Sequence, residues 1–199
     1  GIAVMNLEGI QTRCEDPTSA LETIVSASQD TVTNVLQSIY AKPIEEHLIQ
    51  TRVEQVKSSG SICAVSVTPQ NTKRLAPLAV EAGADVIVVQ STVTTARHIS
   101  RSYKGLVLTE LIPSLKGVPL VVGNCVTYEA ALELIETGID GLLIGVGPGA
   151  ACTTREVTGV GVPQVTATLE CGSRRFRRWK SCSRELAWLR STIAFDRKM

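Results

Sequence analysis

The chain has 199 residues, and its 20 basic and 19 acidic residues leave a net charge of +1. A chain of this length can bury a sizeable core in one domain. The small net charge gives no reason to expect nucleic acid or an anionic membrane as a partner. No apolar run approaches the roughly 18 residues of a membrane span, and the start, GIAVMNLEG, lacks the basic region of a secretory signal. We therefore expect a cytoplasmic protein that binds neither nucleic acid nor membrane.

The six cysteines form no CxxC pair and show no metal-ligand spacing. Cys63 lies in an apolar run typical of a buried strand, which favours a reduced protein over a disulfide scaffold. His47 and His98 stand alone on polar segments. The sequence therefore predicts no metal site built from side chains.

Short apolar runs predict five strands, at residues 1–5, 62–68, 86–90, 119–123 and 141–145. Four helices are expected between and beside them. One begins after Asp16-Pro17 with Leu21, Ile24 and Val25 on one face, and another runs from Pro43 to Ser58 with Gly60 past its end. A third ends at residues 76–82, with Pro77 limiting how far upstream it is regular, and a fourth spans Tyr128 to Glu136.

Two passages of the chain repeat the same pattern. EAGAD at 81–85 leads into VIVVQ, and ETGID at 136–140 leads into GLLIG, so each is a helix end, a glycine, a turn and a buried strand. Wholly apolar strands separated by amphipathic helices predict a parallel α/β sheet covered on both faces. Polar residues follow the strands at Asn6, Gln90 and Asn124. That position suits the ligand site of an open doubly wound sheet and of a TIM barrel alike.

The stretch GLLIGVGPGAACTTREVTGVGVPQ, residues 141–164, holds the strongest candidate site. Gly145, Gly147 and Gly149 allow the backbone to approach a ligand closely or to turn through positive φ, and successive N–H groups in such a loop can bind an anion. Cys152 follows directly. A cysteine in this place is either a small buried apolar residue or a nucleophile beside a phosphorylated substrate.

The string GPGAACTTREVTGVGVPQ closely resembles the active-site cysteine loop of the IMP dehydrogenase / GMP reductase family. NLEGIQTR, AVEAGADVIVVQ and GNCVTYEAALELIETGID resemble a short branch of that family without the regulatory CBS domain pair. The resemblance covers residues 1–168. It implies an incomplete TIM (β/α)8 barrel with about strands two to six, without the family's mobile flap. A chain with that content is expected not to catalyse turnover by itself.

The resemblance also implies a reaction, the NAD-dependent oxidation of IMP to XMP in GMP biosynthesis. A thiolate at Cys152 adds to C2 of the purine, a hydride passes to NAD, and water releases XMP. Thr154 matches the catalytic threonine. The backbone carbonyls of Gly147, Gly149 and Cys152 match a potassium site. The remaining positions that match substrate or cofactor contacts are Asn124, Gly145, Gln90 and Ser91.

Two positions depart from the family pattern. Ala150 stands where a loop serine reaches the IMP phosphate, so contact there falls to the backbone. Gln90-Ser91-Thr92 stands where an Asp-Ser-Ser motif meets the NAD ribose. The second change removes a carboxylate from the expected NAD contact.

Three alternatives stay open. GMP reductase uses the same cysteine, although Val162, where reductases usually carry an aromatic residue, favours the dehydrogenase. The remaining two alternatives are that the chain is a non-catalytic remnant of such an enzyme or a gene-model fragment. Its last part, residues 169–199, supports that alternative, because from Cys171 onward it holds both tryptophans and nine basic residues against two acids. We interpret this tail as foreign to the fold, and the full-length protein as a homo-oligomer, typically a tetramer in the family.

Overall fold

The computed structural model describes residues 1–96, 105–172 and 193–195. The chain divides into two compact units, Gly1–Ile87 and Val88–Met199, with the boundary inside the strand at Val86–Gln90. No helix within the described residues is both long and apolar enough to cross a membrane.

Unit 1 is built on two parallel strands, β1 (Ile2–Asn6) and β2 (Ile62–Val67), at the positions that the sequence predicts. Helices α3 (Glu46–Ser58) and α4 (Pro69–Glu81) pack against β2 and against each other. Their apolar faces form the core of this unit, whose fully buried side chains include Leu48, Ile49, Val53, Val65 and Leu75. Gly60, with a φ of +73°, turns the chain after α3, as expected.

Helix α4 corrects one prediction. It runs unbroken from Pro69 through Pro77 to Glu81, whereas the sequence predicts regular helix only near its end. Pro77 removes one backbone donor from the helix interior. Burial of Leu75, Ala76 and Ala79 on the face toward β2 offsets that loss.

A pair of helices, α1 (Pro17–Ser26) and α2 (Val32–Tyr40), lies between the short 3-10 helix η1 (Ile10–Thr12) and α3. Asp16 caps α1 as predicted, accepting hydrogen bonds from the N–H groups of Thr18 and Ser19. The apolar face of α1 is not buried, since Leu21 is 51% and Val25 83% exposed. Helix α2 was not predicted, although Val32, Val35, Leu36 and Ile39 have the i, i+3, i+4 and i+7 spacing of an amphipathic helix.

Arg13 connects the chain before α1 to the chain at the end of α2. Its Nη1 donates to the backbone carbonyls of Tyr40, at 3.2 Å, and of Lys42. Its Nε donates to the carbonyl of Glu8 at 3.2 Å. The guanidinium carbon lies 5.5 Å from the centre of the Tyr40 ring, a cation–π distance. One side chain therefore joins the start of the helix pair to its end.

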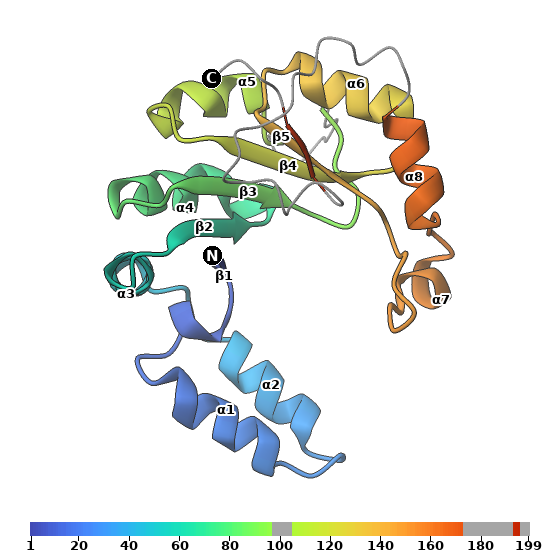
Figure 1. Cartoon of the computed structure of the whole chain (residues 1–199). Coiled ribbons are helices and arrows are strands. Elements are labelled where there is room, and N and C mark those ends of the chain that lie inside the picture. The colour runs from blue at the N-terminus through green and yellow to red at the C-terminus, as the bar shows by residue number, and fades with distance from the viewer. Residues whose placement is uncertain (97–104, 173–192, 196–199) are drawn as a thin grey trace. The chain divides into compact units, whose positions relative to one another are not determined.

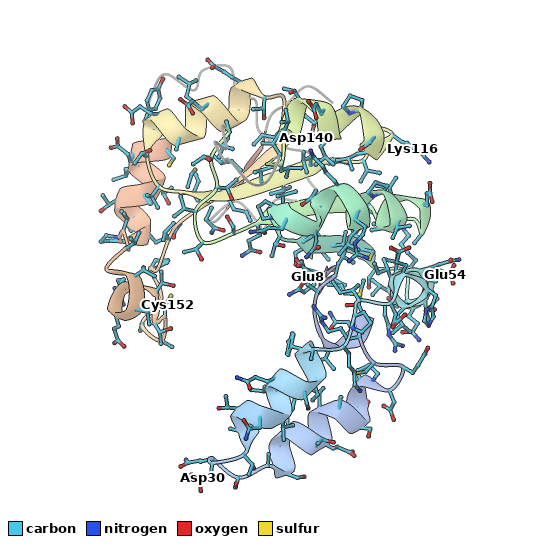
Figure 2. All side chains as sticks on the ribbon, turned by 180° about the vertical axis from the view of Figure 1, so that it is seen from behind. Glu8, Asp30, Glu54, Lys116, Asp140 and Cys152 are labelled. Atoms are coloured by element: carbon cyan, nitrogen blue, oxygen red, sulfur yellow. The ribbon has the colours of Figure 1, made fainter. Side chains whose placement is uncertain are left out.

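Glu8 links the end of β1 to the start of α4 (Figure 2). Its carboxylate accepts hydrogen bonds from Thr68 N at 2.6 Å, from Thr68 Oγ1 at 3.0 Å and from Asn71 Nδ2. Thr68 is the N-cap residue of α4, where backbone N–H groups lack partners within the helix. The negative charge of the carboxylate is also favourable there, because the N-terminal end of the helix dipole is positive.

Unit 2 contains most of β3 (Val86–Gln90), together with β4 (Leu120–Cys125) and β5 (Gly141–Ile144). Strands β4 and β5 are parallel, with a register shift between Gly123 and Cys125. The helical elements, seen in Figure 1, are α5 (Leu108–Leu111), η2 (Ile112–Leu115), α6 (Tyr128–Glu136), α7 (Thr154–Thr158) and α8 (Gln164–Cys171). Helix α6 has the bounds that the sequence predicts and packs on β4 and β5.

The repeat seen in the sequence is a structural repeat. Gly83 follows α4 with a φ of +94°, and Gly138 follows α6 with a φ of +92°. Each glycine adopts the left-handed conformation that ends a helix. A buried strand begins three residues after each of them, β3 at Val86 and β5 at Gly141.

Two described elements reach into the predicted tail of residues 169–199. They are the end of α8 (Gln164–Cys171) and β6 (Ile193–Phe195), which pairs antiparallel with β5 and matches Gly141 with Phe195. The sequence predicts no strand there. The rest of the predicted atypical tail, residues 173–192 and 196–199, lies outside the described residues, as do Cys182 and His98.

Candidate active site

The ends of β3 and β4 are joined by backbone hydrogen bonds. Gln90 is the last residue of β3, and Ser91 follows it. Ser91 N donates to Gly123 O at 3.0 Å, and Asn124 N donates to Ser91 O at 3.2 Å. The Ser91 hydroxyl donates to Val93 O at 2.7 Å. Two predicted site residues, Ser91 and Asn124, therefore lie side by side.

Asn124 extends the link to β5. Its Nδ2 donates to the carbonyl of Gly145 at 2.9 Å, and Gly145 N donates to Cys125 O at 2.9 Å. The side-chain amide thus spans the gap between the ends of two parallel strands. This bond fixes the orientation of Asn124 and leaves its Oδ1 available as an acceptor.

The glycine loop begins where β5 ends and needs its glycines. Gly145 has a φ of +125° and Gly147 a φ of +60°. A Cβ at Gly145 would lie 2.3 Å from Oε1 of Gln164. Gln164 holds this close position because its Nε2 donates to Ile144 O at 3.0 Å. Gln164 was not predicted as a site residue, although it ends the motif GVGVPQ.

Cys152 lies in the loop before α7, at the margin of unit 2 and outside its core (Figure 2). Its Sγ is 3.2 Å from the Oγ1 of Thr154, and its N–H donates to Gly149 O at 3.1 Å. The side chain is half-buried, whereas Cys14, Cys63, Cys125 and Cys171 are buried. The predicted nucleophile is therefore the most accessible of the cysteines that the structure describes.

The surroundings of Cys152 favour its thiolate. The pKa of this thiol is lowered, first by the hydrogen bond with the Thr154 side chain, next by the Thr154 backbone N–H, and also by the positive charge of Arg155. Partial desolvation acts in the opposite direction. Donors and a cation near sulfur stabilise its charged form, which is the reactive nucleophile.

Side chains in the described residues form no cluster of three His, Cys, Asp or Glu suited to a metal ion. The predicted potassium ligands are backbone carbonyls instead. One of these, Gly149 O, already accepts hydrogen bonds from Cys152 N, at 3.1 Å, and from Arg155 Nη2, at 3.2 Å. A cation at that carbonyl would have to share it with, or displace, the guanidinium.

The structure thus brings the predicted residues together in two groups. Ser91, Asn124 and Gly145 form one, at the strand ends, and Gly147, Gly149, Cys152 and Thr154 form the other, in the cysteine loop. Among the described contacts, no hydrogen bond joins Cys152 to Asn124. Arg155 belongs to the second group and was not singled out from the sequence, because an arginine that follows two threonines has no distinctive pattern.

Parallel α/β strands with a glycine loop and an accessible cysteine beyond the last of them are consistent with part of a barrel of the oxidoreductase class, and the comparisons with known proteins identify the family. The profile of the IMP dehydrogenase / GMP reductase domain matches residues 47–180. The chain belongs to this family, as the resemblance of its cysteine loop predicts.

Individual relatives agree with this assignment. An uncharacterised oxidoreductase of Mycolicibacterium smegmatis is 32% identical over 181 residues, covering 88% of this chain and 48% of the relative. The inosine-5'-monophosphate dehydrogenase of Cryptosporidium parvum is 50% identical over 98 residues, which are 49% of this chain and 23% of that protein. The chain therefore spans about half the length of the first relative and less of the second.

A solved structure supports the fold. The IMP dehydrogenase/GMP reductase-like protein of Corynebacterium glutamicum has a TM-score of 0.77 and 34% identity, covering 88% of this chain and 46% of that one. The predicted fold class is confirmed: the parallel α/β strands resemble the TIM barrel of this family. The share of the relative that is covered is consistent with part of a barrel.

Proposed function

We propose that the protein to which these residues belong oxidises IMP to XMP with NAD and water, as an IMP dehydrogenase-like enzyme of GMP biosynthesis. One observation carries the proposal, the half-buried Cys152 thiol whose pKa is lowered by Thr154 and by Arg155. Thiolate is a strong nucleophile, and covalent attachment divides one difficult step into two easier ones.

In this proposal, the Cys152 thiolate adds to C2 of the purine of IMP. Thr154, at 3.2 Å from the sulfur, stabilises the thiolate before attack. The carbon then loses a hydride, which NAD accepts when bound. Hydrolysis of the resulting thioimidate returns Cys152 and gives XMP, so that IMP, NAD⁺ and water yield XMP, NADH and a proton.

The strand-end group is proposed to receive the substrate and the cofactor. Asn124 has its orientation fixed by the bond to Gly145 O, and it presents its remaining amide oxygen as an acceptor. Gln90 and Ser91 offer neutral polar groups where the family motif has a carboxylate. They fit the hydroxyl groups of a ribose by hydrogen bonding, without the charge that the Asp of the motif supplies.

The potassium site fits the chain in part. Backbone oxygens suit a hard monovalent cation, and Gly147, Gly149 and Cys152 remain the proposed ligands. The bond from Arg155 to Gly149 O means that the loop must adjust when the cation binds. We also place the protein in the cytoplasm, as a homo-oligomer when complete.

The experiment uses the complete protein and follows NADH absorbance with IMP and NAD. Cys152→Ala is expected to abolish turnover while IMP still binds, as measured by calorimetry. Cys14→Ala is the matched control, because it removes a buried thiol from unit 1 and leaves the cysteine loop untouched. Sustained turnover by Cys152→Ala would reject the mechanism.

GMP reductase is the second candidate, because the matched family includes both activities. In that reaction Cys152 would add to the same purine carbon of GMP, the amino group would leave as ammonia, and a hydride from NADPH would replace it to give IMP. Oxidation of NADPH in the presence of GMP, without NADH formation from IMP, would establish the reductase. Absence of both activities in the complete protein would favour a non-catalytic relative.

A further inference from the structure

Two buried cysteines of unit 2, Cys125 and Cys171, lie next to each other and have no part in the proposed reaction. Cys125 is the last residue of β4, and Cys171 is the last residue of α8. Their side chains are joined by a hydrogen bond, and both thiols are free. Cys171 Sγ also donates to the carbonyl oxygen of Thr127, two residues beyond Cys125, at 3.6 Å. The end of α8 therefore places one thiol directly against the other.

Helix α8 is held to unit 2 by few side chains. Among its described residues only Ala167 and Cys171 are buried, whereas Val165 is 72% and Leu169 70% exposed. Gln164 adds one hydrogen bond, from its Nε2 to Ile144 O at 3.0 Å. A helix with so little buried apolar surface opens locally at a small cost in free energy. Such opening gives a small oxidant access to the two thiols.

The hydrogen bond between the two side chains makes the thiols unequal. It is the largest cause that lowers the pKa of Cys171, and the largest that raises the pKa of Cys125. Burial and the neighbouring Glu170 oppose the shift at Cys171. Because thiolate is the reactive form, Cys171 is the thiol that attacks an oxidant first. Cys125 is then within reach as the resolving thiol.

We propose that Cys125 and Cys171 form a redox-active pair, which hydrogen peroxide oxidises to a disulfide that fastens α8 to the end of β4. The Cys171 sulfur attacks one peroxide oxygen, so that the O–O bond breaks, Cys171 becomes a sulfenic acid and water leaves. The Cys125 sulfur then displaces the sulfenic oxygen, which takes up the Cys125 proton and leaves as a second water. Two thiols and one hydrogen peroxide thus give one disulfide and two water molecules, and two electrons pass from sulfur to the peroxide.

This step is independent of the proposed function, because it needs neither Cys152 nor IMP. In a reducing compartment a disulfide of this kind is transient and serves redox sensing. Exchange with a dithiol reverses it. The oxidised state would attach α8 covalently beside Asn124, the residue before Cys125.

The test oxidises the full chain with hydrogen peroxide, blocks the remaining thiols with N-ethylmaleimide in denaturant, and identifies linked peptides by mass spectrometry. Trypsin together with a glutamate-specific protease separates Cys125 from Cys152, because Glu129 and Glu133 lie between them. We expect a peptide that links Cys125 to Cys171, with equal loss of the maleimide label at both positions. Dithiothreitol should remove the link and restore both labels.

The fastening of α8 is measured on the same samples. Hydrogen exchange of the α8 amides should slow after oxidation, and the melting temperature should rise by roughly 5–10 °C. Cys125→Ala removes the resolving thiol, so peroxide should leave hydrogen exchange in α8 unchanged. Cys63→Ala removes a fully buried thiol of unit 1, and it should keep both the linked peptide and the slower exchange.

The measurement on the wild type decides the proposal even if Cys125→Ala does not fold. Full maleimide labelling of Cys125 and Cys171 after peroxide treatment would overturn it. Linkage of Cys171 to Cys152 or to Cys182 in place of Cys125 would do the same. A link between Cys125 and Cys171 that leaves hydrogen exchange in α8 unchanged would show that the disulfide does not fasten the helix.

Discussion

Asp140 and Leu120 are joined by two hydrogen bonds where β4 and β5 begin. Leu120 N donates to the Asp140 carboxylate at 2.8 Å, and Asp140 N donates to Leu120 O at 2.9 Å. Asp85 makes the same pair of bonds with Cys63 in unit 1, each at 2.8 Å. The repeated Gly-x-Asp pattern in the sequence therefore marks a repeated contact between the start of one strand and the start of another.

Replacing Asp140 with Ala should lower the free energy of unfolding by about 1–3 kcal/mol, since the buried Leu120 N–H loses a charged acceptor. Urea denaturation followed by circular dichroism measures this. Asp30→Ala, in the exposed turn between α1 and α2 (Figure 2), should stay within about 0.5 kcal/mol of the wild type. Equal stability of the two variants would contradict the role of Asp140.

Gly123→Ala should destabilise unit 2 strongly. The new Cβ would lie 2.4 Å from Leu143 Cβ and 2.6 Å from Leu143 O, and the backbone oxygen cannot move aside easily. We expect a loss of about 3 kcal/mol in the free energy of unfolding, the upper part of the range for overpacking. Gly60→Ala is the comparison, because its φ is +73° and no atom lies within 4 Å of its Cβ position. It should cost only about 1–2 kcal/mol, from left-handed backbone strain.

Gly161→Ala tests the packing of the cysteine loop. Its methyl group would displace the Arg155 stem, so alkylation of Cys152 at pH 7 should slow several-fold and the melting temperature should fall. Gly149→Ala is matched to it, because its Cβ would meet Cys152 Cβ at 3.8 Å, an ordinary contact distance. That variant should keep the wild-type melting temperature. The same response in both glycine variants would show that Arg155 does not fill the space at Gly161.

The free energy of unfolding should depend on the buried thiol of Cys63, in β2, at alkaline pH. Burial, and next the neighbouring Asp85 carboxylate, raise the pKa of this thiol above its ordinary value of 9.0, while Lys57 opposes them. The folded state therefore keeps the proton that the unfolded chain releases. The stabilising contribution is complete below pH 9.0 and is lost as the pH rises toward the folded-state pKa.

Cys63→Ala removes this dependence, so its deficit in the free energy of unfolding relative to the wild type should shrink between pH 7.5 and 10. Val65→Ala truncates another fully buried residue of the same strand without removing a thiol. Its deficit should be equal at both pH values. Parallel behaviour of the two variants would exclude a contribution from the Cys63 proton.

Potassium should activate the complete enzyme. If Gly147, Gly149 and Cys152 offer carbonyls to a monovalent ion, the rate of NADH formation should rise with K⁺ and not with Li⁺, at constant ionic strength. An activity indifferent to the identity of the cation would remove the proposed site.

The strands could be predicted from the sequence because each is an apolar run bounded by polar or turn residues. The cysteine loop could be predicted because its motif is long. Helix α2, which packs on α1, was missed although its apolar residues Val32, Val35, Leu36 and Ile39 have the spacing of an amphipathic helix. The passage of α4 through Pro77 depends on burial against β2, which periodicity does not report.

Contacts made by single polar atoms were also beyond prediction. The hydrogen bond from Arg155 to Gly149 O depends on how the loop folds back toward Gly161. The hydrogen bond from Asn124 to Gly145 O depends on the spacing of two strand ends. Residue type and position along the chain indicate that such side chains are polar. They do not indicate which carbonyl will lie within reach.

Arg13 has a consequence for how this family branch can diverge. It holds the helix pair at its base through the carbonyls of Tyr40 and Lys42, which any amino acid would supply at those positions. Exposed residues between the two ends, such as Leu21 and Val25, can therefore change in sequence, provided that the ends still meet. Since closing a longer loop adds only about 0.6 kcal/mol for each doubling of its length, segments of other sizes could be grafted at this point.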